Sequence, residues 1–269
     1  VASPRGAHDV AMSAPWSNPI VARLAKGDLC DGEYCGLVLV CSWPMPPSVQ
    51  DRVTKLAATL SDVLPAGAYV YPASTLHCTI ATLRAFPGGP LDETEKTASV
   101  ARWTPVLAKA AASPCWPSGP IRLRMNAPTL EGSAGIFRYD DLDGTIGMMR
   151  SALREAISEA GGLAAEGGGD RSQCKLLPGS PPGDPVPHLP DIVHSTVVRW
   201  AAEPQDRSEA AEQFARVAQE WEPIEVTSQC ATAVFEQVPF MHMPYRQATG
   251  EGSDAAQNLV WWTSAASDA

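Results

Sequence analysis

The chain has 269 residues, of which 45% are hydrophobic and 19% are charged, and its formal net charge at pH 7 is −10. A chain of this length buries enough apolar surface to fold without disulfides or a structural metal. The negative net charge argues against a protein that binds extended nucleic acid through a broad basic face, because neutralising phosphates requires clustered Lys and Arg. It leaves room for a small nucleotide or for the end of an RNA chain.

Neither a membrane span nor a cysteine zinc site is indicated. No stretch approaches the run of about 18 apolar residues that a membrane helix needs, so we expect no membrane partner. The cysteines are scattered and form no Cys-x-x-Cys pair: Cys30, Cys35, Cys41, Cys78, Cys115, Cys174 and Cys230. Several lie inside apolar runs, which is typical of a reducing compartment. We therefore expect a cytoplasmic, or more broadly intracellular, protein, with the nucleus or an organelle left open.

The first half of the chain alternates between predicted helices and strands. Residues 1–33 are expected to form an N-terminal arm with one short helix, capped by Ser17 or Asn18 and ended by Gly27. The next predicted elements are a strand at 36–43, a helix at about 49–63 with one apolar face, a strand within 74–86, a helix from about 92 that Pro105 should kink, and a strand at 120–130.

The second half repeats this order of elements. The predicted elements are a strand at 134–140, a helix at 144–160, a Gly- and Pro-rich surface insertion at 161–190, a strand at 191–200, a helix at 204–220, and strands at 224–228, 231–237 and about 258–263. The pair 224–228 and 231–237 is too close for a crossover helix, so we expect an antiparallel hairpin there.

The expected architecture is α+β and bilobal. Lobe one covers about 34–130 and lobe two about 131–269, so that 34–269 forms a single domain after the arm. Each lobe is expected to be an antiparallel sheet with helices on its outer face, the two lobes being related by a rough twofold around a central cleft.

Two of the predicted strands carry the same pattern, His-x-Thr. It reads HCTI from His77 and HSTV from His194. Side chains two apart in a strand share a face, so His77 lies beside Thr79 and His194 beside Thr196. The opposite faces are apolar or small: Leu76, Cys78 and Ile80 in one strand, and Val193, Ser195 and Val197 in the other. If the apolar faces pack under the outer helices, the two His/Thr faces meet across the cleft.

Two imidazoles on either side of a substrate are suited to phosphodiester cleavage. One can deprotonate the attacking water or ribose hydroxyl while the other protonates the departing ribose oxygen, and the threonine hydroxyls can donate to the phosphoryl oxygens. The sequence does not decide which histidine is the base. No acidic cluster accompanies either motif, so we expect neither a metal nor another cofactor.

The paired motifs, HCTI and HSTV in a two-lobed α+β order of elements, resemble those of the two-histidine (2H) phosphoesterase superfamily, including its LigT-like and cyclic phosphodiesterase-like members. The resemblance covers the element order from about residue 35 to 263, although only the two short motifs are specific. It implies His77 and His194 as the catalytic pair and Thr79 and Thr196 as phosphate-binding hydroxyls. The insertion at 161–190 departs from a minimal member, which leaves the substrate class and the role of this segment open.

Further side chains are candidates for substrate contacts. Two arginines follow the motifs along their strands, Arg84 and Arg199. Five aromatic residues offer a surface on which a nucleobase can stack: Tyr71, Phe137, Tyr139, Trp200 and Phe235. The loop 239–247 is a candidate for the mouth of the cleft. The remaining histidines, which lack the motif, are interpreted as structural or exposed: His8, His188 and His242.

The predicted activity is the metal-independent hydrolysis of 2′,3′-cyclic phosphates or of short RNA-end or oligonucleotide phosphodiester bonds. Two alternatives stay open: a non-catalytic module that binds nucleotides or RNA ends, and an RNA end-joining 2′-5′ ligase. The expected partner is a small nucleotide or an RNA 3′ end, bound by a monomer.

Overall fold

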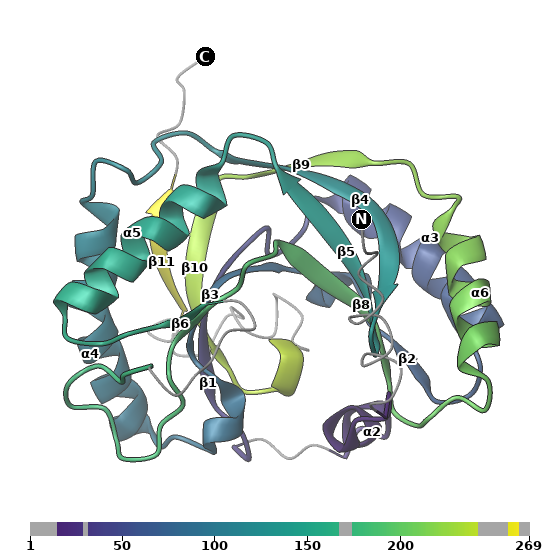
Figure 1. Cartoon of the computed structure of the whole chain (residues 1–269), viewed down its shortest axis with the longest axis horizontal. Helices are drawn as coiled ribbons and strands as arrows, with labels where there is room; N and C mark the ends of the chain where they lie inside the picture. The colour runs from purple at the N-terminus through teal and green to yellow at the C-terminus, as the bar shows by residue number, and fades with distance from the viewer. Residues whose placement is uncertain (1–14, 29–31, 167–173, 242–257, 264–269) are drawn as a thin grey trace, which may run out of the picture.

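The computed structural model describes residues 15–28, 32–166, 174–241 and 258–263. In these residues two largely antiparallel sheets stand side by side, and helices cover the outer face of each (Figure 1). The expected α+β class and two-sheet architecture are confirmed. The predictions for His8, His242 and most of the loop 239–247 lie outside the described residues.

The six-stranded sheet has a fully buried strand near its centre. Its strands run in the order β11 (Asn258–Thr263), β10 (Cys230–Glu236), β1 (Gly36–Cys41), β3 (Cys78–Arg84), β7 (His188–Leu189) and β6 (Ala165–Glu166). All six residues of β1 are buried, as its continuous apolar run predicts. Leu37 and Leu39 belong to the main core, whereas Val38 lines a cavity between the two sheets.

The five-stranded sheet is antiparallel throughout. Its strands run in the order β2 (Ala68–Val70), β8 (His194–Trp200), β5 (Ala134–Asp141), β4 (Ile121–Glu131) and β9 (Ile224–Ser228). In β4 the side chains alternate: Ile121 and Leu123 are buried, and Arg122 between them is exposed. This period of two gives the sheet one face in the core and one in solvent.

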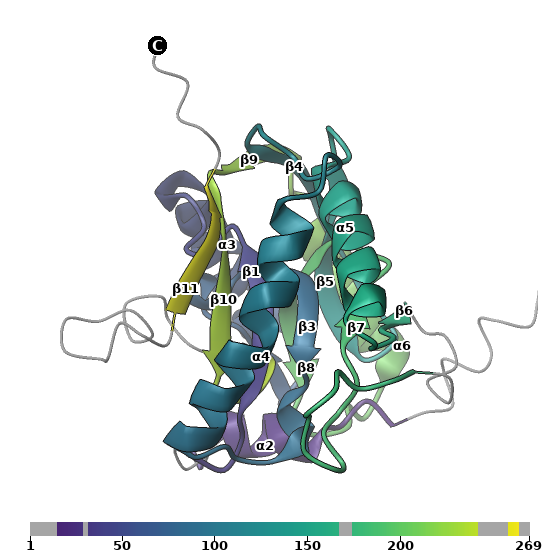
Figure 2. The same ribbon diagram turned by 90° about the vertical axis from the view of Figure 1, so that its left-hand side faces the viewer.

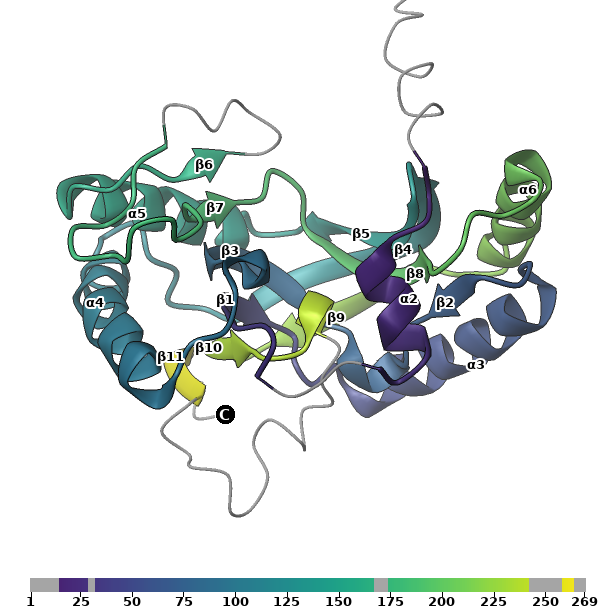
Figure 3. The same cartoon turned by 90° about the horizontal axis from the view of Figure 1, so that it is seen from below.

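Two pairs of long helices enclose the sheets. The helices α4 (Glu93–Ala111) and α5 (Thr145–Glu159) pack together over the six-stranded sheet (Figure 2). On the other side, α3 (Pro47–Val63) and α6 (Arg207–Ala218) lie against the five-stranded sheet, as the view from below shows (Figure 3). Three short 3₁₀ turns complete the described elements: η1 (Ala73–Thr75), η2 (Phe86–Gly88) and η4 (Pro239–Met241).

The short helix of the N-terminal arm, α2 (Pro19–Ala25), is capped by Asn18, whose side chain accepts from the amides of the first turn. The arm is anchored to the five-stranded sheet. Its Trp16 ring lies 5.2 Å from that of Trp200, and the Asn18 amide donates to the Trp200 carbonyl at 3.0 Å.

The sheets exchange strands across the lobe boundary expected at about residue 130. β10 and β11 pair with β1 and β3, while β2 and β4 join β5 and β8. The boundary itself falls in the β4–β5 hairpin, where Glu131 pairs with Ala134 around a two-residue turn. The two sheets therefore do not correspond to the expected lobes, 34–130 and 131–269. The physical reason is burial: β1 is buried along its whole length and β10 along all but its first residue, and the two strands pair in the interior of one sheet.

The prediction of an antiparallel hairpin between 224–228 and 231–237 is wrong. β9 pairs with β4 in one sheet, and β10 pairs with β1 in the other. Only Gln229 separates the two strands, whereas the shortest common hairpin loop has about two residues. The chain therefore crosses between the sheets at this point.

The segment 161–190 is more than a surface insertion. Leu177 and Leu189 are buried, and β7 pairs with β3 through His188 and Thr82. This part of the chain extends the six-stranded sheet and places new side chains beside the first motif.

Candidate active site

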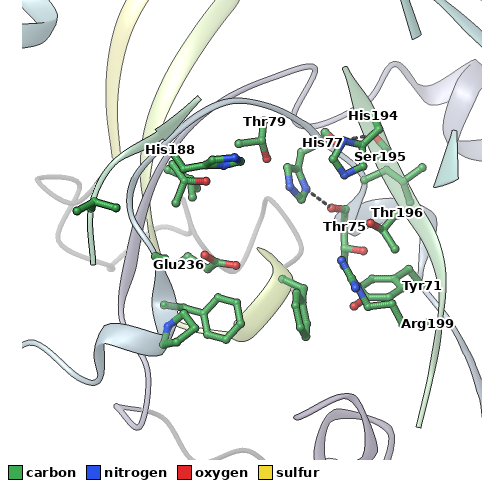
Figure 4. A pocket seen from close by; sticks show the side chains of 18 residues that line it. Tyr71, Thr75, His77, Thr79, His188, His194, Ser195, Thr196, Arg199 and Glu236 are labelled. Atoms are coloured by element: carbon green, nitrogen blue, oxygen red, sulfur yellow. Dashed lines mark hydrogen bonds between the residues drawn. The ribbon is translucent and has the colours of Figure 1, made fainter. Parts of the chain in front are cut away.

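A cavity of about 470 Å³ lies between the two sheets. Its wall carries both His-x-Thr pairs, His77 with Thr79 and His194 with Thr196 (Figure 4). The volume falls within the range of roughly 300–1,000 Å³ typical of small-molecule sites. The two motifs thus converge on one cavity, as the strand faces predict.

The first motif begins where η1 ends. Leu76, Cys78 and Ile80 are buried under the helices, and the half-buried His77 and Thr79 face the cavity. The His77 ring is oriented by a hydrogen bond of 3.0 Å between its Nδ1 and the Thr75 carbonyl. Since a carbonyl oxygen only accepts, Nδ1 carries the proton, and Nε2 of the neutral ring is left as the basic nitrogen.

The second motif opens β8. Ser195 and Val197 are buried, while His194 and Thr196 are half-buried and line the cavity. The pairing of β8 with β5 fixes the position of this strand, with His194 opposite Arg138. The expected alternation therefore holds in both strands.

Ser195 ties the two motifs together. Its Oγ donates to the His77 carbonyl, and the Tyr139 hydroxyl donates to Ser195 Oγ at 3.1 Å. This contact joins β8 of one sheet to the residue before β3 of the other. Ser195, the residue between His194 and Thr196, therefore holds the backbone of His77, the histidine of the other motif.

Arg150 of α5 forms a second tie. Its guanidinium donates to the carbonyls of Ile80 at 3.0 Å, Thr79 at 2.9 Å and Ile192 at 3.1 Å. Ile192 lies two residues before His194, so one buried side chain holds the backbones of both motifs. In the described residues β3 pairs with β7 at Thr82, and nearer the start of β3 the guanidinium supplies donors to the carbonyls of Thr79 and Ile80.

Burial lowers the pKa of both histidines. The pKa of His77 falls to about 4 because burial disfavours the charged ring, and nearby His194 lowers it further. The pKa of His194 is lowered by burial first, and then by the positive charges of Arg199 and Arg150. Both rings are therefore neutral at pH 7 when the cavity is empty.

Arg199 and Tyr71 lie together on the cavity wall below the second motif (Figure 4). The Arg199 guanidinium lies over the Phe240 ring, 4.3 Å from its centroid. Its Nε is buried and has no hydrogen-bond partner among the described residues. The cavity therefore holds a cation with donor capacity beside the two imidazoles.

Arg84 does not line the cavity. Its side chain is buried, with Nε 2.9 Å from Asp184 Oδ1 and the other nitrogens donating to the carbonyls of Cys35, Gly88 and Gly89. The ion pair with Asp184 joins the segment 161–190 to the end of β3. Four of the candidate aromatic residues are likewise buried in the core away from the cavity: Phe137, Tyr139, Trp200 and Phe235.

The structure brings other side chains to the cavity that sequence patterns did not single out. His188, interpreted from the sequence as structural or exposed, lines the cavity from β7. Glu236, at the end of β10, and Phe86, in η2, line it as well. Phe240, the part of the candidate loop that is described, has φ +60, a left-handed conformation that is uncommon for an aromatic residue.

The described residues include neither a group of side chains placed to hold a metal ion nor a helix able to cross a membrane. No group of three or more His, Cys, Asp or Glu side chains is placed there to hold a metal ion. Within the same residues, none of the helices combines the length and the apolar character needed to cross a membrane.

No family profile and no curated protein matches the chain. Among solved structures, it is similar to TT0787 of Thermus thermophilus, with 16% identity, a TM-score of 0.44, and 74% of this chain and 87% of that chain covered. It is also similar to E. coli LigT complexed with 3′-AMP, with 14% identity, a TM-score of 0.42 and coverages of 76% and 88%. For the MHV ns2 PDE domain the identity is 11%, the TM-score 0.37 and the coverages 65% and 83%.

Proposed function

We propose that the protein is a phosphodiesterase that opens 2′,3′-cyclic phosphates or cleaves short RNA-end or oligonucleotide bonds by acid–base catalysis with two histidines. One observation carries the proposal. His77 and His194 come from different sheets, and each brings a threonine to the same cavity. A binding module has no need of two such neutral imidazoles, whereas in-line displacement at phosphorus uses one as base and one as acid.

In the proposed reaction His77 is the base. Its Nδ1 is held by the Thr75 carbonyl and its pKa is low, so at neutral pH Nε2 is free to accept a proton from the attacking water. A new bond forms between that oxygen and phosphorus, the bond to the ribose oxygen breaks, and His194 protonates the leaving oxygen. His194 needs a proton for this step, and a bound phosphate anion favours its charged form.

The remaining cavity groups are assigned to the phosphate. The hydroxyls of Thr79 and Thr196 and the guanidinium of Arg199 are proposed to donate to the non-bridging oxygens, where negative charge increases in the transition state. Both proton transfers are assigned to imidazoles, so the scheme requires no metal. The cavity volume of about 470 Å³ favours a small nucleotide or an RNA 3′ end as the substrate.

The test is turnover of 2′,3′-cyclic nucleotides and of 2′-5′ and 3′-5′ oligonucleotides in EDTA, comparing the parent with His77→Ala and His194→Ala. Each variant is expected to lose about 10²–10⁴-fold in kcat. The double variant is expected to lose little more, because the two groups act in one step. Glu155→Gln is the matched control, since this exposed side chain of α5 lies away from the cavity.

Full activity in either histidine variant would contradict the mechanism. Activity that disappears in EDTA and returns with a divalent cation would assign the chemistry to a metal. Joining of a cyclic-phosphate end to a 5′-hydroxyl oligonucleotide would favour the ligase alternative, and binding without turnover would favour the binding module.

A further inference from the structure

One wall of the cavity carries two ionisable side chains that the proposed chemistry does not use. Figure 4 shows His188 and Glu236 on this wall, across from His77, His194 and Arg199. Glu236 is the last residue of β10, and His188 opens β7. A carboxylate and a third imidazole thus face His194 and Arg199 across the cavity, and Thr79 lies between His188 and His77 (Figure 4).

Glu236 is placed there by the packing of β1 and β10. It pairs directly with Gly36, and a Cβ at position 36 would lie 2.8 Å from Glu236 Oε2. The missing side chain of Gly36 therefore makes room for the carboxylate. Only 5% of Glu236 is exposed, although the residue lines the cavity. A buried acidic group facing a site for a phosphate ester would repel the phosphate, so it is better suited to another part of the ligand.

Apolar and aromatic side chains line the same cavity as Glu236. Phe86 and Phe240 pack edge to face with ring centroids 5.0 Å apart, and Pro87 and Val186 belong to the lining as well. Apolar walls with a few convergent polar groups are typical of sites for flat heterocycles. The cavity is therefore suited to hold a nucleobase beside these side chains, with the phosphate at the two motifs.

We infer that Glu236 and His188 form a subsite that recognises guanine. The inference rests on the proposed function, since it places the phosphate of the substrate at the two motifs. Guanine presents two neighbouring N–H donors, N1–H and N2–H, and one carboxylate can accept both. The adjacent O6 can accept from a ring N–H of His188. Single-stranded RNA ends are commonly read at this edge of the base.

The other bases fit this wall less well. Adenine places the lone pair of N1 where guanine has a donor, so it would face the carboxylate with an acceptor. Uracil offers one donor, N3–H, flanked by two carbonyl oxygens, and cytosine offers only its amino group. Selectivity then arises both from the paired donors of guanine and from repulsion of bases that present acceptors. A good bidentate contact of this kind discriminates by about tenfold or more.

The test measures kcat/KM for the four 2′,3′-cyclic nucleotides with the parent, with Glu236→Gln and with the control Glu155→Gln. In the parent, the guanosine substrate is expected to exceed the other three by about tenfold or more. Glu236→Gln keeps the size of the side chain but replaces one acceptor by a donor, so guanosine turnover should fall about tenfold and adenosine turnover should change little. Glu155→Gln should retain the preference of the parent.

A second measurement separates this inference from the proposed function. Calorimetric titration of the parent with guanosine and adenosine 2′-monophosphates reports the base preference without catalysis and without a variant that has to fold. If neither the cyclic nucleotides nor the 2′-5′ and 3′-5′ oligonucleotides are turned over, the proposed function is overturned. The titration then still tests the subsite: tighter binding of the guanosine nucleotide supports it, and equal binding of the two nucleotides contradicts it. Turnover with equal kcat/KM for all four bases, or a preference that survives Glu236→Gln, overturns the subsite and leaves the phosphodiesterase standing.

Discussion

Replacing Arg150 tests whether one buried guanidinium holds both motifs in place. The side chain is 7% exposed and donates to three backbone carbonyls, two in the first motif and one just before the second. Arg150→Met keeps most of the aliphatic volume but removes all three donors. The carbonyls of Thr79, Ile80 and Ile192 then lose their charged partner.

The size of the effect follows from those three bonds. A hydrogen bond to a charged group stabilises by about 1.5–3 kcal/mol, so the three together contribute roughly 4.5–9 kcal/mol. Ordering the arginine side chain costs about 2 kcal/mol, and removing its charge from water costs several more. We therefore expect Arg150→Met to lower the free energy of unfolding by about 2–4 kcal/mol, and Arg150→Lys, which keeps the charge without the planar fork, by less.

The assay is urea denaturation followed by tryptophan fluorescence, with turnover measured on the folded fraction. The control is Arg216→Met on α6, since that arginine is exposed, and its effect should stay within about 0.5 kcal/mol. Loss of kcat in folded Arg150→Lys, with KM little changed, would show that the tie positions the histidines. A denaturation midpoint for Arg150→Met equal to that of Arg216→Met would refute the reasoning.

Two further predictions follow from the buried groups of the site. Burial gives His77 a pKa of about 4 in the folded chain, against about 6.5 in the unfolded chain. At a pH between these two values, the unfolded chain therefore binds more protons at His77 than the folded chain does. The contribution of His77 to stability should therefore be complete above about pH 6.5 and fall as the pH drops toward 4. Urea midpoints measured across this window should vary less with pH in His77→Gln than in the parent. Equal pH dependence in the two proteins would contradict the assignment of this effect to His77. In a double-mutant cycle, Ser195→Ala leaves the Tyr139 hydroxyl without its acceptor and lowers the free energy of unfolding. Adding Tyr139→Phe should recover about 1 kcal/mol of that free energy. Strictly additive effects would mean that the contact between Tyr139 and Ser195 contributes nothing.

Much of the local structure could be predicted because it follows from short-range rules. The Asn18 cap with Pro19 behind it predicts the start of α2, and the spacing of Val49, Val53 and Leu56 predicts the buried face of α3. The side-chain alternation of the two His-x-Thr strands predicts which residues face the cavity. In each case the signal lies within one element, where covalent geometry sets the period.

The partners of those elements could not be predicted in the same way. The exchange of β10 into the sheet of β1, and the separation of β9 from β10, depend on which buried strand edges meet, and no local pattern encodes that choice. Arg84 illustrates the same limit. Its position beyond the first motif made it a candidate for substrate contact, but Asp184, distant in sequence, binds it in the structure.

The sequence by itself therefore determined the class of the fold and the two pairs of chemical groups, His77 with Thr79 and His194 with Thr196. Only the tertiary structure decided what surrounds them: the ties made by Ser195 and Arg150, and the wall that carries Glu236. The physical reason is range. Alternation along a strand acts over two residues, whereas a cavity is built by side chains that sheet pairing and helix packing bring together from distant parts of the chain.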